Sequence, residues 1–446
     1  MSLLRHTLTG ASGGTNLEPY WMPFTDNRRF KSNPNFLAAA EGMYYFTPDG
    51  ARVLDGTAGL WCVNAGHCRP RIVDAVQKQV AKLDYAPSFQ IGHPLAFACA
   101  EELLKLFPAE FNNVFFANSG SEAVDSALKI ALAYHRANGQ GARTRFIGRE
   151  RAYHGVGFGG LSVGGIPANR RSFIQLPGVD HLPHTYDPEN TAFTAGQPRR
   201  DDRFAGALEA IIALHGSENI AAVIVEPMAG STGVLVPPVG YLERLREITA
   251  ANGILLIFDE VITAFGRLGA GTAAEYFGVI PDIITCAKGL TNGTVPMGAA
   301  VVKKDIYDTV TALNRPGIEF FHGYTYSGHP LAAAASLATL EIYAEEGLFA
   351  RARDLSGYWA KAVHALKGRP HIIDIRSIGL VAGIELAPRK NDPGGRGMEL
   401  FQRCLDAGLL IRITGDIVAL SPPLIVEMEH IDAMVETIAK QLGHIA

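Results

Sequence analysis

The sequence predicts an α/β protein: a large domain with a doubly wound, mostly parallel sheet, and a small α+β domain. Three observations support this prediction. The middle of the chain alternates short apolar runs with amphipathic stretches, which is typical of parallel strands joined by helices. Several of these runs are apolar throughout, as expected of strands covered by helices on both faces. In the C-terminal part of the chain the pattern of predicted elements changes to shorter strands with two helices, which indicates a separate, smaller unit.

The expected elements follow one another in a regular order. The strands of the large sheet are predicted at Val114–Ala117, Ala221–Glu226, Ile254–Phe258, Ile283–Cys286 and Gly298–Val302. Helices are predicted at Ala123–Ala133, Ala205–Leu214, Tyr241–Ala251, Pro330–Glu345 and Phe349–Leu366. The C-terminal unit is expected to have strands at Ile372–Ile375, Leu380–Leu386, Leu409–Ile413 and Val418–Leu420, and helices at Gly397–Ala407 and Glu429–Leu442. The polar stretch Pro188–Arg203 is expected to form an excursion loop.

Composition and charge exclude several classes of protein. The 446 residues include 40 Lys and Arg against 44 Asp and Glu, and the resulting net charge of −4 argues against nucleic-acid binding and against an anionic membrane as partner. Hydrophobic residues make up 48%, which fits a large packed core. No apolar run is long enough for a transmembrane helix. Residues 1–17 are expected to form a frayed polar tail rather than a transit peptide.

The cysteines favour a reducing environment. Their number is odd and no CxxC pair occurs, so neither a disulfide framework nor a zinc or other metal site is expected, and a cytoplasmic location is favoured. The five are Cys62, Cys68, Cys99, Cys286 and Cys404.

Two attractive motifs lack the context that their function requires. Residues 155–160 match GxGxxG, but residues 149–154 are too polar for the strand that must precede a dinucleotide site, and Gly164–Pro167 would interrupt the helix that must follow. A flexible glycine loop is the simpler interpretation. The apolar run before Asp259-Glu260 resembles the acidic strand of a nucleoside triphosphatase, but the chain contains no GxxxxGK[ST] loop.

Three segments carry residues suited to binding or catalysis. Each follows a predicted strand, at the edge where open α/β sheets bind ligands. Asn118–Ala123 begins a helix with small residues, which suits a phosphate, although Ser119 and Glu122 equally suit an ordinary capping box. Asp259 ends an apolar strand, and a buried carboxylate there needs a partner such as a protonated ring nitrogen. Lys288 follows another apolar strand. A desolvated lysine has a lowered pKa and can form an imine, although a lone lysine is more often a surface residue.

Together the three segments describe one ligand, an aromatic aldehyde with a phosphate arm and a basic ring nitrogen. Pyridoxal 5′-phosphate fits that description. Its ring is an electron sink, and Asp259 would keep the ring nitrogen protonated so that the sink works.

The chain resembles the class III pyridoxal-phosphate aminotransferases, in particular the omega-amino acid:pyruvate (beta-alanine:pyruvate) type. The resemblance covers nearly the whole chain and is most specific from Leu255 to Ala299, while Leu60-Trp61 and Gly323–Pro330 also match. Cys68 departs from the glycine of many relatives, and Leu290–Pro296 fits the amine:pyruvate branch better than the ornithine branch.

The resemblance implies a fold-type I architecture divided into three parts. Residues 1–70 would contribute to the small domain, residues 71–323 would form the large cofactor-binding domain, and residues 324–446 would form the rest of the small domain. It also implies a homodimer with shared active sites, which could pair into a tetramer.

Roles for residues around the cofactor ring follow from the resemblance as well. Lys288 would be the catalytic lysine that forms an imine with the cofactor, and Asp259 would be the partner of the ring nitrogen. Tyr153 would stack on one face of the ring and Val261 would pack on the other. Glu226 would lie near the ring hydroxyl.

The resemblance also implies how the phosphate is bound. Ser119, Gly120 and Ser121 would hold it within the same chain, and Thr325 would reach the phosphate of the neighbouring subunit.

Substrate recognition is implied for two further residues. Arg412 would bind the substrate carboxylate as a bidentate pair, and Trp61 would line the substrate pocket. Without the family, Arg412 would be read as a salt-bridge residue and Trp61 as a core aromatic. His154 is carried over only weakly, because it could simply brace the glycine loop.

The implied activity moves an amino group from an omega-amino acid or a primary amine to pyruvate, which gives a semialdehyde or ketone and alanine. An aminomutase or decarboxylase of the same fold, a 4-aminobutyrate or ornithine-type aminotransferase, and a non-catalytic binding protein remain open alternatives. Stoichiometric formation of alanine from pyruvate separates an aminotransferase from an aminomutase or decarboxylase, and a reducible imine separates an enzyme from a binding protein.

Overall fold

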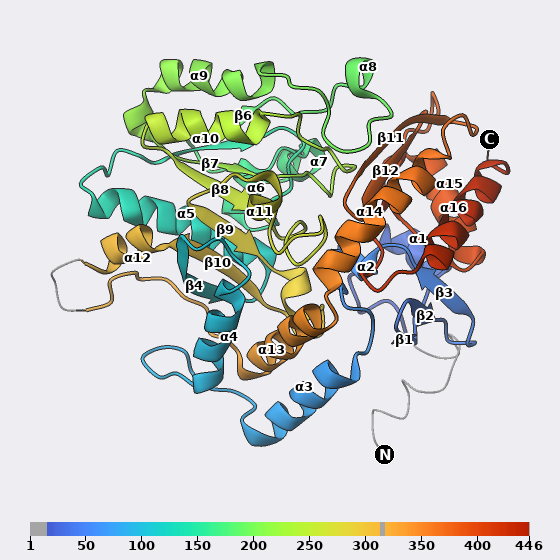
Figure 1. The fold of residues 1–446 in the computed structure, drawn as a ribbon, viewed down its shortest axis with the longest axis horizontal. Coiled ribbons are helices and arrows are strands. Elements are labelled where there is room, and N and C mark those ends of the chain that lie inside the picture. Colours follow the sequence, from blue (N-terminus) through green and yellow to red (C-terminus); the bar gives the residue numbers. More distant parts are fainter. Residues whose placement is uncertain (1–15, 313–316, 446) are drawn as a thin grey trace.

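A computed structural model of the chain describes residues 16–312 and 317–445. Of the tail predicted at residues 1–17, residues 1–15 lie outside the described part. Figure 1 shows a large sheet with helices around it and, beside it, a smaller part built from both ends of the chain. None of the described helices combines the length and the apolarity that crossing a membrane would require.

A seven-stranded sheet forms the centre of the larger part. Its strands are β4 (Phe111–Ala117), β5 (Arg145–Arg149), β6 (Val179–Leu182), β7 (Ile220–Val225), β8 (Leu255–Asp259), β9 (Ile283–Cys286) and β10 (Gly298–Lys303). Their order in the sheet is β4-β10-β9-β8-β7-β5-β6. From β9 to β6 all neighbours are parallel, whereas β10 is antiparallel to both β9 and β4. All five strands expected from the sequence are present, and the sheet is mostly parallel as predicted, with β10 as its antiparallel strand. The strands β5 and β6 were missed.

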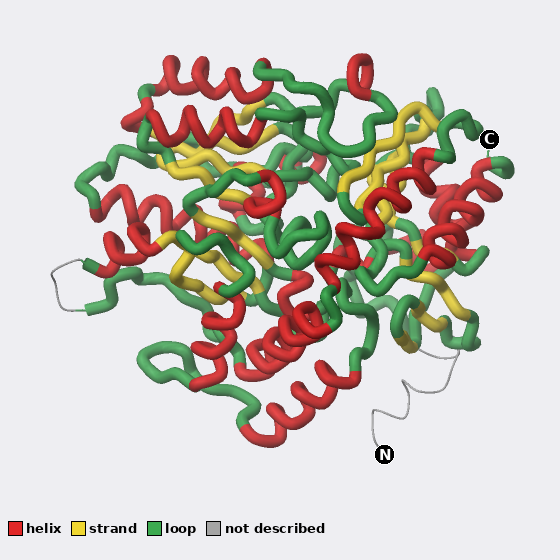
Figure 2. The backbone as a smooth tube through the Cα atoms, viewed as in Figure 1, coloured by secondary structure: helices red, strands yellow, loops and turns green. Residues whose placement is uncertain are grey.

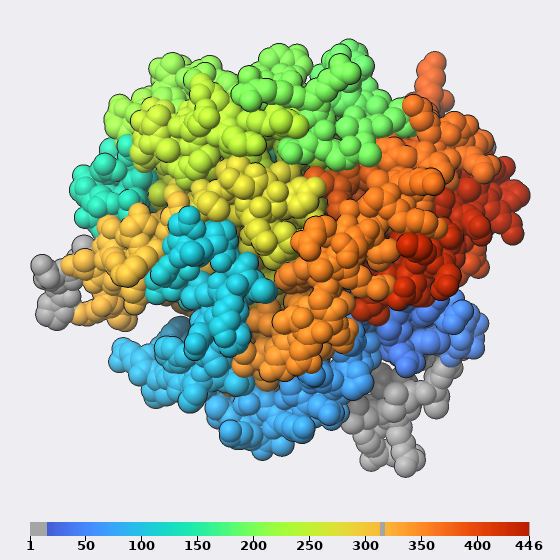
Figure 3. All heavy atoms as spheres, in the orientation of Figure 1, coloured from blue at the N-terminus to red at the C-terminus, as the bar shows by residue number. Residues whose placement is uncertain are grey.

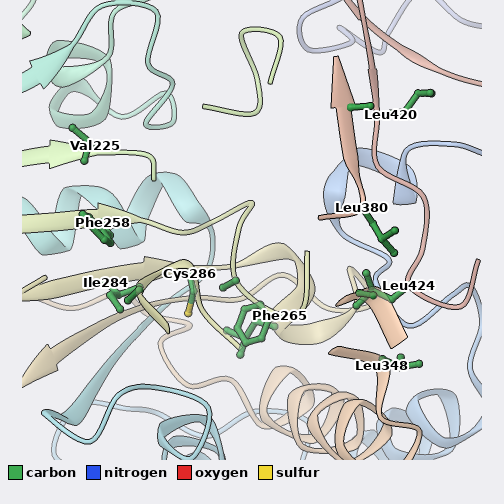
Figure 4. Packing of buried hydrophobic residues seen from close by; sticks show 14 of the residues in the cluster. Val225, Phe258, Phe265, Ile284, Cys286, Leu348, Leu380, Leu420 and Leu424 are labelled. Carbon is green, nitrogen blue, oxygen red and sulfur yellow. The ribbon is translucent and has the colours of Figure 1, made fainter. Parts of the chain in front are cut away.

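Helices cover the sheet on both faces, as a doubly wound fold requires. One face packs on α5 (Gly120–Ala137), whose small side chains meet Ile224, Leu255 and Ile257. The other face packs on α9 (Arg203–His215) and α10 (Tyr241–Ala251), and its residues Val225, Phe258 and Ile284 point into the apolar core drawn in Figure 4. The burial follows from period two along each strand, because alternate side chains point to opposite faces.

The remaining helices of the larger part are mostly short. They are α3 (Pro70–Lys82), α4 (Pro94–Leu104), α6 (Phe158–Val163), α7 (Pro167–Arg171), α8 (Pro188–Thr191), α11 (Ala273–Phe277), α12 (Lys304–Thr311) and the 3-10 turns η2 (Ser217–Asn219) and η3 (Lys288–Thr291). The expected excursion loop therefore contains a short helix, α8, and a bridge from Ala195 to Ser377 ties it to the C-terminal part.

The smaller part combines both ends of the chain in two four-stranded sheets. The first contains β1 (Ala39–Glu41), β2 (Tyr44–Phe46), β3 (Arg52–Asp55) and β13 (Leu409–Leu410). The second contains β11 (Ile372–Ile378), β12 (Val381–Leu386), β15 (Ile417–Leu420) and β14 (Arg412–Thr414). The helices there are α1 (Asn27–Ser32), α2 (Ala58–Trp61), α14 (Leu348–His364), α15 (Gly395–Asp406) and α16 (Met428–Leu442).

One expected strand is divided between these two sheets. The stretch 409–413 pairs with β3 through β13, and after Ile411 it pairs with β15 through β14. This change of sheet joins the N-terminal and C-terminal segments, which lie together in the space-filling view of Figure 3. The helix α13 (Pro330–Glu345) packs on α3, α4 and η3, and the backbone tube of Figure 2 shows it below the large sheet. The division into domains at residues 70 and 323 stays a prediction.

Candidate active site

The carboxyl ends of β7, β8 and β9 meet at one edge of the large sheet and surround a cavity of about 150 Å³. The same edge receives the N-terminus of α5, because β4 runs in the direction of β9. Seven of the eleven expected site residues line the cavity. Its lining consists of Gly120, Ser121, Tyr153, His154, Gly155, Glu226, Asp259, Val261, Ile262 and Lys288.

Asp259 is held by three hydrogen bonds at the end of β8, where its exposed fraction is only 5%. Its Oδ2 lies 2.7 Å from His154 Nδ1. Its Oδ1 accepts from the backbone N–H of Val261 at 3.1 Å and from Thr285 Oγ1 at 3.2 Å. Because every one of these partners donates, the ionised carboxylate is stabilised and its orientation is fixed. The side chain can therefore offer a negative charge to a cation inside the cavity.

His154, which the sequence analysis carried over only weakly, lines the cavity and contacts Asp259. Its ring is buried and donates to Asp259 instead of only bracing the glycine loop. Within the described residues its Nε2 has no hydrogen-bond partner. The contact joins residues that are far apart in the chain, so periodicity and local motifs carried no signal for it.

Lys288 begins η3 one residue after the end of β9, and it is half-buried. Desolvation lowers the pKa of its amine, although the nearby Cys62 and Asp259 act in the opposite direction. A lowered pKa leaves more of the amine neutral at a given pH, and the neutral amine is the nucleophile. The backbone of Lys288 also has a positive φ of 50°, a conformation that non-glycine residues adopt only where the surroundings enforce it.

The strained turn at Lys288 is clamped by neighbours that the sequence analysis did not single out. Tyr343 Oη donates to the carbonyl of Gly289 at 2.7 Å. The amide of Asn292 donates to the carbonyl of Gly66 and accepts from the backbone N–H of Ala65, both at 2.8 Å. These contacts fix the backbone of the lysine while its side chain remains free to react.

Glu226 follows β7 and supports the segment that carries Tyr153. Its Oε1 accepts from the backbone N–H of Tyr153 at 2.8 Å. Burial raises the pKa of Glu226, and the positive charge of Arg149 opposes that rise. Arg149 is itself buried and donates to the backbone carbonyl of Glu226 at 2.9 Å. Glu226 and Tyr153 therefore form one fixed wall of the cavity.

The N-terminus of α5 carries a capping box and also faces the cavity. Ser119 Oγ accepts from the backbone N–H of Glu122 at 3.2 Å, and Glu122 Oε2 accepts from the N–H of Asn118 at 2.7 Å. Ser119 therefore caps the helix and is absent from the cavity lining, whereas Gly120 and Ser121 line the cavity beside the positive end of the helix dipole. The two interpretations that the sequence left open are compatible, because they use different residues.

The glycine loop at residues 155–160 is closely packed, which corrects the expectation of a flexible loop. A Cβ on Gly155 would lie 2.4 Å from Ser121 Oγ, and Gly155 has a φ of 90°. A Cβ on Gly160 would lie 2.1 Å from the backbone oxygen of His154. A strand, β5, does precede this loop and a short helix, α6, does begin in it, so its context is closer to the motif than the sequence suggested. The glycines serve close packing on α5.

Besides Ser119, three expected site residues lie outside the cavity lining. Trp61 is buried in an apolar cluster with Ile262, and Ile262 in turn lines the cavity. Arg412 lies in β14, and its Nε is buried without a partner among the described residues. Burial lowers the pKa of Arg412, and Tyr153 opposes this effect. Thr325 is exposed, and its carbonyl accepts from Tyr85 Oη at 3.1 Å.

The cavity residues fit pyridoxal 5′-phosphate. The helix N-terminus at Gly120 suits its phosphate, the carboxylate of Asp259 suits its ring nitrogen, and the amine of Lys288 suits its aldehyde. Gly120 also leaves room that a side chain would fill, because a Cβ there would lie 2.9 Å from Val261 Cγ1.

Comparison with known proteins gives the same result. The model of the family "Aminotransferase class-III" matches residues 27–442. An omega-aminotransferase of Caulobacter vibrioides is 61% identical over 97% of this chain and 99% of its own length. A beta-alanine–pyruvate aminotransferase of Pseudomonas aeruginosa is 48% identical over 98% of both chains.

Solved structures agree in fold. An amine transaminase from an uncultivated Pseudomonas species, in its PLP-bound form, has a TM-score of 0.89 at 35% identity and covers 96% of this chain and 99% of its own. An (S)-enantioselective omega-transaminase from Thermomicrobium roseum has a TM-score of 0.89 at 34% identity and covers 96% of this chain and 97% of its own. The expected fold-type I architecture and PLP-dependent transaminase activity are confirmed, and this family implies pyridoxal phosphate as cofactor. This chain belongs to the class-III aminotransferases.

Proposed function

We propose that this protein binds pyridoxal 5′-phosphate and transfers the amino group of an omega-amino acid or primary amine to pyruvate. The products are a semialdehyde or ketone and alanine, formed in two half-reactions that alternate between the aldehyde and amine forms of the cofactor. The observation that carries the proposal is the convergence of Lys288 and Asp259 on one cavity beside the N-terminus of α5. Relatives named for beta-alanine and for omega-amino acids, with pyruvate as acceptor, support the substrate class.

When bound, the cofactor supplies an electron sink that makes the proton on the substrate carbon acidic. The chain supplies the rest. Lys288 Nζ would hold the cofactor by its aldehyde, and the same amine would serve as the base that takes the proton from the substrate carbon and as the acid that gives it back. Asp259 would hold a proton at the ring nitrogen, and His154 keeps the carboxylate in place through the 2.7 Å contact. Tyr153 and Val261, which line the cavity, would hold the ring, and Glu226 fixes the backbone of Tyr153.

Arg412 is proposed to bind the carboxylate of pyruvate and of amino-acid donors. Its side chain is half-buried in β14, and the neighbour that opposes the lowering of its pKa is Tyr153 rather than an acid. A buried guanidinium without a carboxylate partner is costly until an anion arrives, which favours binding of a carboxylate there. Trp61, behind Ile262, is proposed to limit the size of the donor.

The active site is proposed to be completed by a second copy of this chain. Thr325 is exposed in a segment that presents several large apolar side chains to solvent, including Phe321 at 89% and Tyr326 at 58%. Phe89 and Phe97 are also exposed, at 59% and 72%, and Phe89 contacts this segment next to Gly323. Exposed apolar surface of this kind marks a protein interface. Burial of this surface in a homodimer would bring Thr325 to the partner's phosphate site, and such dimers could pair into tetramers.

The protein is also proposed to work in the cytoplasm. All five cysteines are free, and three of them are buried, which agrees with a compartment that keeps thiols reduced.

A panel of donors tests the proposed reaction. Purified protein is incubated with pyridoxal phosphate, pyruvate and one donor at a time: beta-alanine, 4-aminobutyrate, taurine or 1-phenylethylamine. We expect alanine to form in equal amount to the carbonyl product with at least one omega-donor, and Lys288→Ala to abolish it. Carbon dioxide release without alanine would instead identify a decarboxylase, and rearrangement of the donor without pyruvate would identify an aminomutase.

A test of the dimer uses Thr325→Val, because valine keeps the shape of threonine and removes only its hydroxyl. We expect light scattering to give a dimer for both proteins, and the Kd for pyridoxal phosphate to rise about tenfold in the variant, as loss of one hydrogen bond to a charged group implies. A monomeric wild-type protein, or a variant with unchanged affinity, would contradict the shared site.

A further inference from the structure

A turn of the larger part, residues 231–233, offers three consecutive backbone carbonyls to three side chains from different elements. The carbonyl of Ser231 accepts from Thr414 Oγ1 at 2.9 Å. The carbonyl of Thr232 accepts from Arg151 Nη2 at 3.2 Å. The carbonyl of Gly233 accepts from Nε and Nη2 of Arg376, at 3.1 and 2.8 Å. The turn therefore ties β14 and β11 of the smaller part to the segment that follows β5.

The turn is rigid as well as highly connected. Gly233 has a φ of 109°, which glycine adopts readily, whereas Val234 has a φ of 59°, which a β-branched residue keeps only where the surroundings enforce it. A Cβ on Gly233 would lie 2.6 Å from Ile417 Cδ1, so the turn packs directly against β15, the strand next to β14.

The arginine that holds Gly233 is itself fixed by a buried network. Arg376 donates to Asp374 and, at 2.7 Å, to Glu385. Glu385 also accepts from Tyr186 Oη at 2.7 Å. The guanidinium groups of Arg376 and Arg151 lie 4.7 and 4.8 Å from the centre of the Tyr186 ring. The residues that bind Gly233 and Thr232 are therefore held in place independently of β14.

Thr414 is the contact of this turn that bears on the substrate. It lies two residues after Arg412 in the same short strand, β14, so the two side chains leave the strand on the same face. That face is directed at the larger part, where Thr414 reaches Ser231 and Arg412 lies near Tyr153. Tyr153 follows Arg151 by two residues, and Arg151 is bonded to the carbonyl of Thr232. The strand that carries Arg412 and the segment that carries Tyr153 are therefore both attached to the same turn.

We propose that Thr414 is a positioning residue: its hydrogen bond to the Ser231 carbonyl sets the register of β14 and so the distance of Arg412 from the cavity. The proposal rests on the proposed role of Arg412 in binding the substrate carboxylate. Loss of this hydrogen bond weakens recognition of substrates that carry a carboxylate and leaves the reaction of uncharged amines intact.

The experiment compares Thr414→Val with wild type as holoenzymes. The KM for pyruvate and for beta-alanine is measured, together with the single-turnover rate of 1-phenylethylamine, which has no carboxylate. We expect both KM values to rise about five- to tenfold, the range that one net hydrogen bond implies. The rate with 1-phenylethylamine should stay within twofold. Thr414→Ser retains the hydroxyl and should restore both KM values.

Thr249→Val is the matched control, because it also removes a threonine hydroxyl that donates to a backbone carbonyl, that of Leu245 at 2.8 Å, but inside α10. It should change none of these values. Equal losses with charged and uncharged substrates in Thr414→Val, or failure of Thr414→Ser to restore the KM, would overturn the proposal. Arg412→Gln separates it from the proposed function. If that variant raises the KM for pyruvate and Thr414→Val does not, only the positioning role fails, and if Arg412→Gln leaves the KM unchanged, the role of Arg412 fails as well.

Discussion

Replacement of Asp259 by asparagine should abolish most of the activity while the protein remains folded. The amide has the same shape as the carboxylate, and it can still accept from the Val261 N–H and from Thr285 Oγ1, which lie 3.1 and 3.2 Å from Oδ1. On the other side, the amide nitrogen would face His154 Nδ1 at 2.7 Å, and one buried hydrogen bond is lost or must rearrange. That change costs about 1–3 kcal/mol of stability.

The effect on catalysis should be larger, because the negative charge is lost as well. Two unit charges about 4 Å apart interact by about 4 kcal/mol at an effective dielectric constant near 20. If that interaction keeps the ring nitrogen protonated during the reaction, its loss slows the chemical step by about a thousandfold. Single-turnover absorbance with 1-phenylethylamine measures this step directly, and thermal unfolding of the same sample measures stability.

Asp282→Asn provides the control for removal of a partnered carboxylate. Asp282 lies near the other end of β9 and pairs with Arg246 and Lys303, at 2.7 and 2.9 Å. The Asp282→Asn variant should have a lower unfolding temperature but no thousandfold loss of rate. A rate for Asp259→Asn within tenfold of wild type would refute the assignment of Asp259 as the partner of the ring nitrogen.

Two further predictions concern the glycine loop and the lysine. Gly160→Ala should lower the unfolding temperature, measured by calorimetry, by several degrees, because the new Cβ would meet the His154 carbonyl at 2.1 Å. Gly357 is the control, since it is exposed in α14 and a Cβ there would have nothing within 4 Å. Gly357→Ala should leave the unfolding temperature equal or slightly higher. The rate at which the apoprotein takes up pyridoxal phosphate should rise with pH as Lys288 loses its proton, and it should level off well below pH 10.5, since burial lowers the pKa of this amine from 10.5. Stopped-flow absorbance checks this profile, and a rate that still climbs to pH 10.5 would show an ordinary, solvated lysine.

Much of the large domain could be predicted from the sequence because its central strands are buried on both faces. Such strands are continuous apolar runs, and β7, β8 and β9 were all expected close to their observed bounds. The strand β5 was missed because it begins and ends with arginine. Arg149 is nevertheless buried, since its guanidinium donates to the carbonyl of Glu226 and lies near the ring of Tyr241, and no local pattern shows that such a partner exists.

The site was predictable where chemistry and strand ends coincide. Asp259 and Lys288 stand out because each interrupts an apolar run at the edge where ligands bind. The contact between His154 and Asp259, and the clamp of Asn292 on the turn at Lys288, join segments that only the folded chain brings together. The same is true of Thr414, whose partner Ser231 belongs to another part of the chain.

Reduction of the holoprotein with borohydride, followed by peptide mapping, is the most direct test that one lysine and one cofactor define this site. Borohydride fixes the imine between an amine and pyridoxal phosphate as a stable secondary amine. The modified residue should be Lys288 alone, in one equivalent per chain, and the visible absorbance should disappear in step with labelling. Recovery of the label on another lysine, or no label on a protein saturated with pyridoxal phosphate, would contradict the assignment.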